Sequence, residues 1–162
     1  MGWKFEIHAE SQVPASAQAV WVRVRDHEGT PEWVTRGLQS VTLTRPGDRL
    51  RLGVGAMRAV KFMAWPAVTE EIVGYDDEEM FFSYALRSGM PHVTEHLGTV
   101  SVHKVSDDAC TLRWDIEFEF NPWHPLSWSA PVFIAGFNKV VQDGCDELAR
   151  QFTASAAAQV EA

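Results

Sequence analysis

TLRWDIEFEF, residues 111–120, alternates apolar or aromatic side chains with polar ones along its whole length. This period-two pattern predicts a strand with one dry face and one wet face. Residues 131–152, which follow Pro122 and Pro125, instead repeat apolar residues every three or four positions, at Phe133, Phe137, Val140, Val141, Cys145, Leu148 and Phe152. That spacing predicts a long helix with one buried stripe. Together the two patterns predict a sheet that packs against a C-terminal helix.

Upstream of these segments the chain is dominated by further strand patterns. They cover residues 3–10, 41–44, 53–62, 67–75, 80–87 and 95–105. Pro14 predicts a helix over residues 15–25, and Thr30 as N-cap with Pro31 predicts a second short helix. Because the later connections are short turns, the strands are expected to pair antiparallel. The fold class is therefore α+β: a curved seven-stranded antiparallel sheet, two short helices after the first strand, and a long C-terminal helix. One domain is expected over residues 1–153, with a frayed tail at 154–162.

Composition narrows the functions to consider. Acidic residues outnumber basic ones, for a net charge of −8, which disfavours nucleic acid as a partner. The N-terminus lacks the apolar stretch of a signal peptide, and no apolar run is long enough to cross a bilayer. Cys110 and Cys145 are expected to be free thiols. We expect a cytoplasmic protein with no cofactor, no metal and no integral membrane association.

The aromatic content indicates a cavity. The chain has seven Trp and nine Phe but only two Tyr, and one helix is too narrow to fill the concave side of a seven-stranded sheet. We therefore expect a cavity between sheet and helix that holds an apolar small molecule. The side chains expected to line it are Trp33, Arg58, Trp65, Phe82, Tyr84, Leu86, Trp114, Ile116, Phe118, Phe133, Phe137 and Val140. Five Trp (Trp33, Trp65, Trp114, Trp123 and Trp128) are candidates for an aromatic cage, with ordinary packing as the alternative for each. Gly136 and Gly144 in the helix allow a strand or a ligand to approach closely.

Several short motifs occur in an order that resembles a known superfamily. They lie at residues 14–21, 31–34, 53–58, 70–76, 98–102 and 111–114. By the order and spacing of these motifs, the chain resembles the START/SRPBCC helix-grip superfamily, and within it the polyketide cyclase/dehydrase-like branch. The resemblance implies the helix-grip fold but not one function, because that fold serves aromatase/cyclases and lipid carriers alike. The aromatase/cyclases of this superfamily have arginines in the cavity at two positions, and the resemblance places Glu71 and Leu86 there in this chain. This departure weakens the cyclase interpretation.

Three polar features are candidates for chemistry. Arg58 either points into the cavity to bind a ligand oxygen or forms an outward salt bridge. Glu71 is a candidate general base if it is buried, although an outward position fits burial statistics better. The string from His92 to His96 matches a zinc-protease motif, but on a strand the two rings would lie roughly 13 Å apart, too far for one zinc ion.

Three functions follow from these observations. The first is a carrier or sensor of an apolar or aromatic small molecule. The alternative is a polyketide-type aromatase/cyclase or dehydratase. A third is a protein whose groove is covered by another chain, with a homodimer as one possibility.

Overall fold

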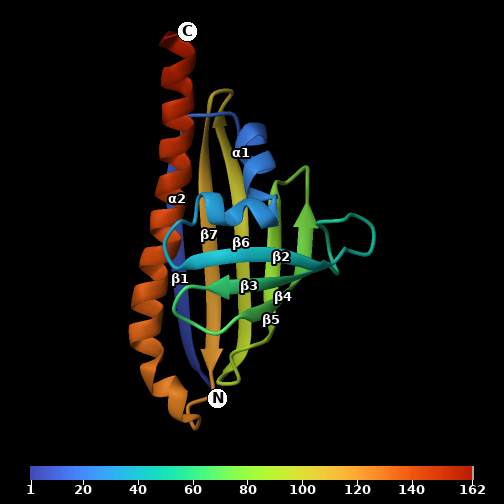
Figure 1. Cartoon of the computed structure of the whole chain (residues 1–162), viewed down its shortest axis with the longest axis vertical. Coiled ribbons are helices and arrows are strands. Elements are labelled where there is room, and N and C mark those ends of the chain that lie inside the picture. The colour runs from blue at the N-terminus through green and yellow to red at the C-terminus, as the bar shows by residue number, and fades with distance from the viewer. Residues whose placement is uncertain (162) are drawn as a thin grey trace.

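The computed structural model describes residues 1–161, which form one antiparallel sheet, a long helix beside it and short helices in the connections after the first and the last strand (Figure 1). The strands are β1 (Trp3–Val13), β2 (Leu38–Arg45), β3 (Met57–Phe62), β4 (Val68–Asp76), β5 (Phe81–Ser88), β6 (Val93–Ser106) and β7 (Ala109–Phe120). Their order in the sheet is β1-β7-β6-β5-β4-β3-β2. This arrangement confirms the predicted α+β helix-grip fold.

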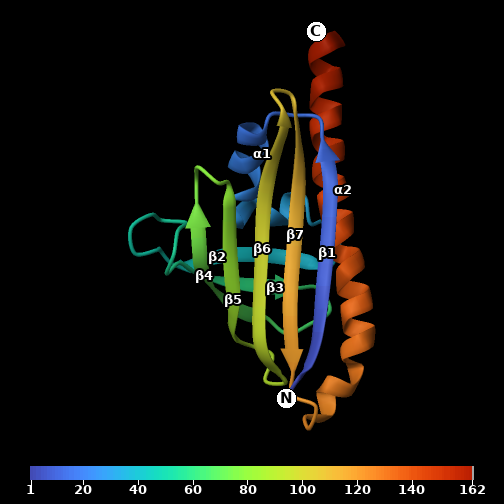
Figure 2. The ribbon, with the colours of Figure 1, turned by 180° about the vertical axis from the view of Figure 1, so that it is seen from behind.

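The sheet is strongly curved. β2 and β3 cross in front of β6 and β7 in Figure 1, and Figure 2 shows β1, β7 and β6 from the opposite side. The predicted alternation of β7 is confirmed, since Leu112, Ile116 and Phe120 are fully buried. β7 pairs with β1 on one side and with β6 on the other. Its buried face is therefore part of the hydrophobic core.

The first connection contains α1 (Ala17–Val24) and the 3-10 helix η1 (His27–Glu32). The predicted second helix is therefore present but misplaced: it ends near Pro31 instead of beginning there. The carbonyl of Thr30, expected as the N-cap, accepts hydrogen bonds from the backbone N–H groups of Trp33 and Val34 at 3.1 and 2.9 Å. Thr30 thus helps to end a helical turn, so Thr30 and Pro31 lie at the end of this helix and not at its start.

The third strand begins at Met57, later than the predicted residue 53. Gly55 has a φ of +89°, and a Cβ there would lie 2.6 Å from Oδ1 of Asp48. Only glycine adopts this left-handed conformation without strain. The segment before Met57 is therefore a turn, which still exchanges backbone hydrogen bonds with Ile72 of β4.

The chain ends with the 3-10 helix η2 (Pro125–Ser129) and α2 (Ala130–Glu161), which runs along β1 (Figure 2). Val141, Cys145 and Leu148 of its apolar stripe are fully buried. The helix continues to Glu161 instead of ending near Phe152, and its last turns project past the β6–β7 hairpin (Figure 1). These turns are rich in alanine, which has the highest helix propensity. No helix within residues 1–161 is long and apolar enough to span a membrane.

Candidate functional site

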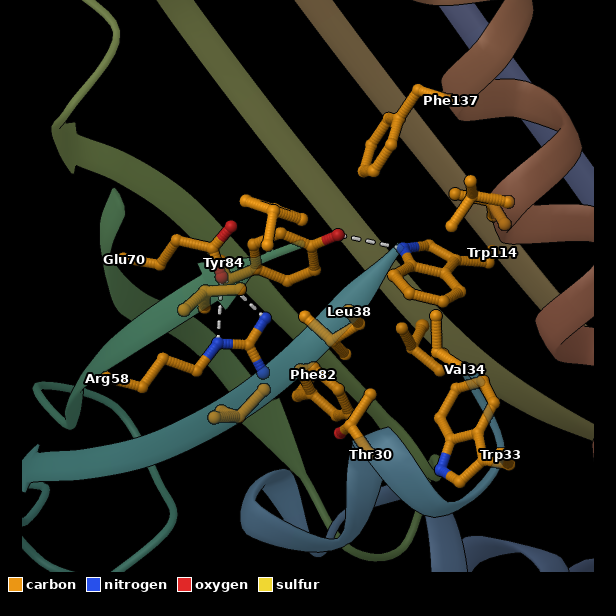
Figure 3. Close-up of a pocket in the computed structure, with 16 residues that line it drawn as sticks. Thr30, Trp33, Val34, Leu38, Arg58, Glu70, Phe82, Tyr84, Trp114 and Phe137 are labelled. Atoms are coloured by element: carbon orange, nitrogen blue, oxygen red, sulfur yellow. Dashed lines mark hydrogen bonds and ion pairs between the residues drawn. The ribbon is translucent and has the colours of Figure 1, made fainter. Parts of the chain in front are cut away.

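Two adjoining cavities, which share lining residues, lie between the sheet and α2. We name them the inner chamber, with a volume of about 40 Å³, and the outer chamber, with a volume of about 600 Å³. Phe62, Glu70, Tyr84 and Phe137 line both chambers and so mark the junction between them. The inner chamber (Figure 3) has room for little more than a water molecule. The outer chamber is large enough for a small organic ligand.

Most of the residues predicted for the cavity line one of the two chambers. Those in the inner chamber are Trp33, Arg58, Phe82, Tyr84, Trp114, Phe137 and Val140. Those in the outer chamber are Trp65, Tyr84, Leu86, Phe118, Phe133 and Phe137.

Aromatic rings dominate one wall of the outer chamber. Phe133 and Phe137, one helical turn apart on α2, stack with ring centroids 5.5 Å apart. Trp65, from the β3–β4 connection, packs edge-on against both rings at 5.2 and 6.0 Å. The chamber therefore offers flat apolar surfaces to a ligand.

The two glycines of α2 have different surroundings. A Cβ at Gly136, which lines the outer chamber, would meet no heavy atom within 4 Å. A Cβ at Gly144 would lie 3.1 Å from Cγ2 of Val34. Gly144 thus accommodates a close approach of the chain after η1, whereas Gly136 faces open space.

Some candidates lie outside both chambers. Ile116 is fully buried in the core and lines neither cavity. Glu71 points away from the chambers and forms ion pairs with Arg87 and Arg45 at 2.7 and 3.8 Å. Trp123 and Trp128 are 90% and 75% exposed, so the aromatic cage includes neither of them. Both follow prolines in irregular or 3-10 segments, where no strand or helix period fixes which way a side chain points.

Arg58 points inward and is already paired. Its Nε and Nη2 atoms each lie 2.8 Å from Oε2 of Glu70 on the neighbouring strand. Nη1 donates to Nδ1 of His27 at 3.3 Å, and the guanidinium lies 4.4 Å from the centre of the Tyr84 ring. Burial and the adjacent Arg58 charge lower the pKa of His27 to about 3. Arg58 therefore anchors a buried polar cluster and has little capacity left for a ligand.

Tyr84 lines both chambers, and Figure 3 shows its hydroxyl pointing toward the indole of Trp114 in the inner chamber. Its hydroxyl accepts a hydrogen bond from the indole Nε1–H of Trp114 at 2.8 Å. Burial raises the pKa of the Tyr84 phenol, so it remains protonated at neutral pH. Its ring lies against β6 at Gly98, where a Cβ would be 2.1 Å from Cζ of Tyr84. Gly98 is thus the residue that makes room for this ring.

The two histidines of the zinc-like string have different roles. His96 on β6 lines the outer chamber, and its Nδ1 accepts a hydrogen bond from the backbone N–H of Leu86 at 3.2 Å. His92 precedes β6 and stacks on His124 with ring centroids 5.6 Å apart. Among residues 1–161 no three His, Cys, Asp or Glu side chains are arranged to hold a metal ion.

Sequence reasoning did not select Glu70, His27 or His96 for the site. Glu70 had a usable signal, because strand alternation places it with Val68 and Ile72 on the buried face of β4. His27 lies in the 3-10 helix, which has no comparable period. His96 was considered only as a zinc ligand.

Comparison with known proteins supports the fold. The family model described as polyketide cyclase / dehydrase and lipid transport matches residues 4–153. A norcoclaurine synthase mutant from Thalictrum flavum, in complex with a transition-state analogue, is similar with a TM-score of 0.72 and 18% identity, covering 96% of this chain and 98% of that one. A protein from Thermus thermophilus has a TM-score of 0.74 and 16% identity, covering 93% and 99%. An uncharacterised Bacillus thuringiensis protein has a TM-score of 0.71 and 17% identity, covering 92% and 99%. No curated protein matches the sequence. At these identities the structural likeness establishes the fold alone.

Proposed function

This chain belongs to the polyketide cyclase/dehydrase and lipid transport family, and we propose that it binds an apolar or aromatic small molecule in the outer chamber. The observation that carries the proposal is the open volume of about 600 Å³ beside the stacked rings of Phe133 and Phe137. Ligand pockets of small molecules typically measure 300–1,000 Å³ and are mainly apolar. Each Å² of apolar surface that a ligand removes from water contributes about 25 cal/mol.

A carrier or sensor role fits the cysteine chemistry of the chain. Cys110 and Cys145 are both buried. Burial raises the pKa of the Cys145 thiol to about 12, which keeps it in the unreactive thiol form. Neither cysteine lines the outer chamber. Neither cysteine is therefore placed to react with a ligand in the outer chamber, which supports a carrier or sensor role.

The experiment uses N-phenyl-1-naphthylamine, an uncharged fluorophore that brightens in apolar surroundings. The wild-type protein is expected to give saturable brightening. Gly136→Leu fills open space in the chamber without a clash, so it is expected to weaken binding at least tenfold while the helix is retained. Ala135→Leu is the matched control, because Ala135 is the exposed neighbouring position and does not line the chamber. Equal binding by the two variants, or no saturable binding by the wild type, would refute the proposal.

One observation favours a cyclase or dehydratase as a second candidate. Glu70 lines the outer chamber, and its Oε1 accepts no hydrogen bond from the described residues, since Arg58 engages Oε2. A free carboxylate oxygen there can accept a proton from a carbon next to a ligand carbonyl. The assay is exchange of the α-hydrogens of 2-tetralone in D₂O, followed by NMR. Exchange no faster than in buffer, or equally fast with Gly136→Leu, would count against this candidate.

A further inference from the structure

The hydroxyl of Tyr84 has a hydrogen-bond donor that the protein does not use. Tyr84 is only 2% exposed, and its oxygen already accepts the proton of Trp114 Nε1. Within residues 1–161 no atom accepts the hydroxyl proton of Tyr84 in return. Leaving a buried donor without a partner costs free energy, so such groups usually bind a ligand or water. Tyr84 lines both chambers, so a molecule in the outer chamber would meet this donor where its polar end reaches the junction with the inner chamber.

The position of this donor is fixed before any ligand binds. The indole of Trp114 holds the oxygen, the Arg58 guanidinium covers one face of the ring, and the missing side chain of Gly98 admits the ring onto β6. A donor that is held in place in this way loses little conformational entropy when it binds an acceptor. This preorganisation is what a recognition group requires.

His96 supplies a second donor nearby. Its ring centroid lies 5.5 Å from that of Tyr84, and both residues line the outer chamber. Nδ1 accepts the Leu86 backbone N–H, so the neutral ring carries its proton on Nε2. Burial lowers the pKa of His96, which favours this neutral form. The polar end of the outer chamber thus has two donors, the O–H of Tyr84 and the Nε2–H of His96.

The charges around these donors select against an ionised ligand. Glu70 brings a carboxylate to the same wall, and Arg58 already neutralises it. An anionic ligand would meet the free oxygen of Glu70, whereas a cationic ligand would meet two hydrogen-bond donors beside a carboxylate whose charge Arg58 already balances. An uncharged acceptor is favoured.

Resting on the proposed binding function, we propose that the ligand is a mainly apolar ring compound with an uncharged carbonyl oxygen, which accepts a hydrogen bond from Tyr84. The apolar part of the molecule then packs against Phe133 and Phe137. His96 is close enough to assist as a second donor to the same end of the ligand.

The test compares fluorene with 9-fluorenone, which share a skeleton and differ in a CH₂ group and a carbonyl. The wild-type protein is expected to bind fluorenone about fivefold to tenfold more tightly, the ratio expected from one added neutral hydrogen bond. The infrared carbonyl band of bound fluorenone is expected to move to lower frequency than in hexane. Tyr84→Phe is expected to abolish the preference while fluorene still binds.

The outcomes separate this inference from the proposed function. If both compounds bind equally and the carbonyl band of the wild-type complex is unshifted, the Tyr84 donor is not a recognition group, although the chamber still binds apolar molecules. If neither compound binds, both proposals fail. Tyr84→Phe also leaves Trp114 Nε1 without its acceptor. If that variant unfolds, the infrared band in His96→Phe decides the question, because this variant keeps Tyr84 and removes the other donor; an unshifted band there would refute the role of Tyr84.

Discussion

Replacing Glu70 with leucine is expected to leave a buried cation without its counterion. The side chains of Arg58 and Glu70 are only 7% and 9% exposed, and two guanidinium nitrogens contact one carboxylate oxygen at 2.8 Å. Removal of one member of such a pair costs about 3–5 kcal/mol, because the remaining charge stays out of water. The cation–π contact of Arg58 with Tyr84 compensates only in part.

The neighbouring residue provides a matched control. Glu71→Leu removes a carboxylate that is 27% exposed and paired with Arg87 on the outer face of the sheet. Exposed pairs of this kind contribute at most about 1 kcal/mol. The two substitutions are one residue apart and chemically identical, so any difference between them measures burial of the charge.

Urea denaturation, followed by tryptophan fluorescence, gives the free energy of unfolding of each variant. For a chain of this size, a loss of 3–5 kcal/mol lowers Tm by roughly 6–20 °C. The double variant Arg58→Met/Glu70→Leu is expected to recover most of the loss, since it removes both charges from the interior. If Glu70→Leu is no more destabilising than Glu71→Leu, the assignment of a costly buried pair is wrong.

Three further predictions follow from close contacts and from one buried base. Gly144→Leu is expected to destabilise the fold by about 1–3 kcal/mol in urea denaturation, since the new side chain overpacks against Val34. Gly98→Ala is expected to displace the Tyr84 ring and lower Tm, and an unchanged near-ultraviolet circular dichroism spectrum would contradict this. The pKa of His27 is lowered in the folded chain. The unfolded chain therefore takes up a proton at this residue below about pH 6.5, whereas the folded chain resists protonation down to about pH 3. Stability should therefore be undiminished above about pH 6.5 and fall by about 2–3 kcal/mol by about pH 4.5, and His27→Gln should remove that part of the pH dependence.

The residues that face the cavity could be predicted only in part from strand alternation. Alternation correctly placed Arg58 on the same face as Val60, yet it left open whether the side chain was inside or outside the fold. The answer came from the register of β3 against β4, which sets Arg58 opposite Glu70. A slip of one residue would bring Glu71 to that position and reverse both faces.

By itself the sequence determined the order of the elements and which residues of each strand share a face, because the periods of strands and helices are local properties of the chain. The helix after residue 130 and the strand over residues 111–120 were readable for that reason. Only the tertiary structure decided that Tyr84 rests on Gly98, that the outer chamber stays open at Gly136, and that Trp123 faces solvent. These features depend on register, on β-bulges and on packing between segments distant in sequence, and no local period encodes them.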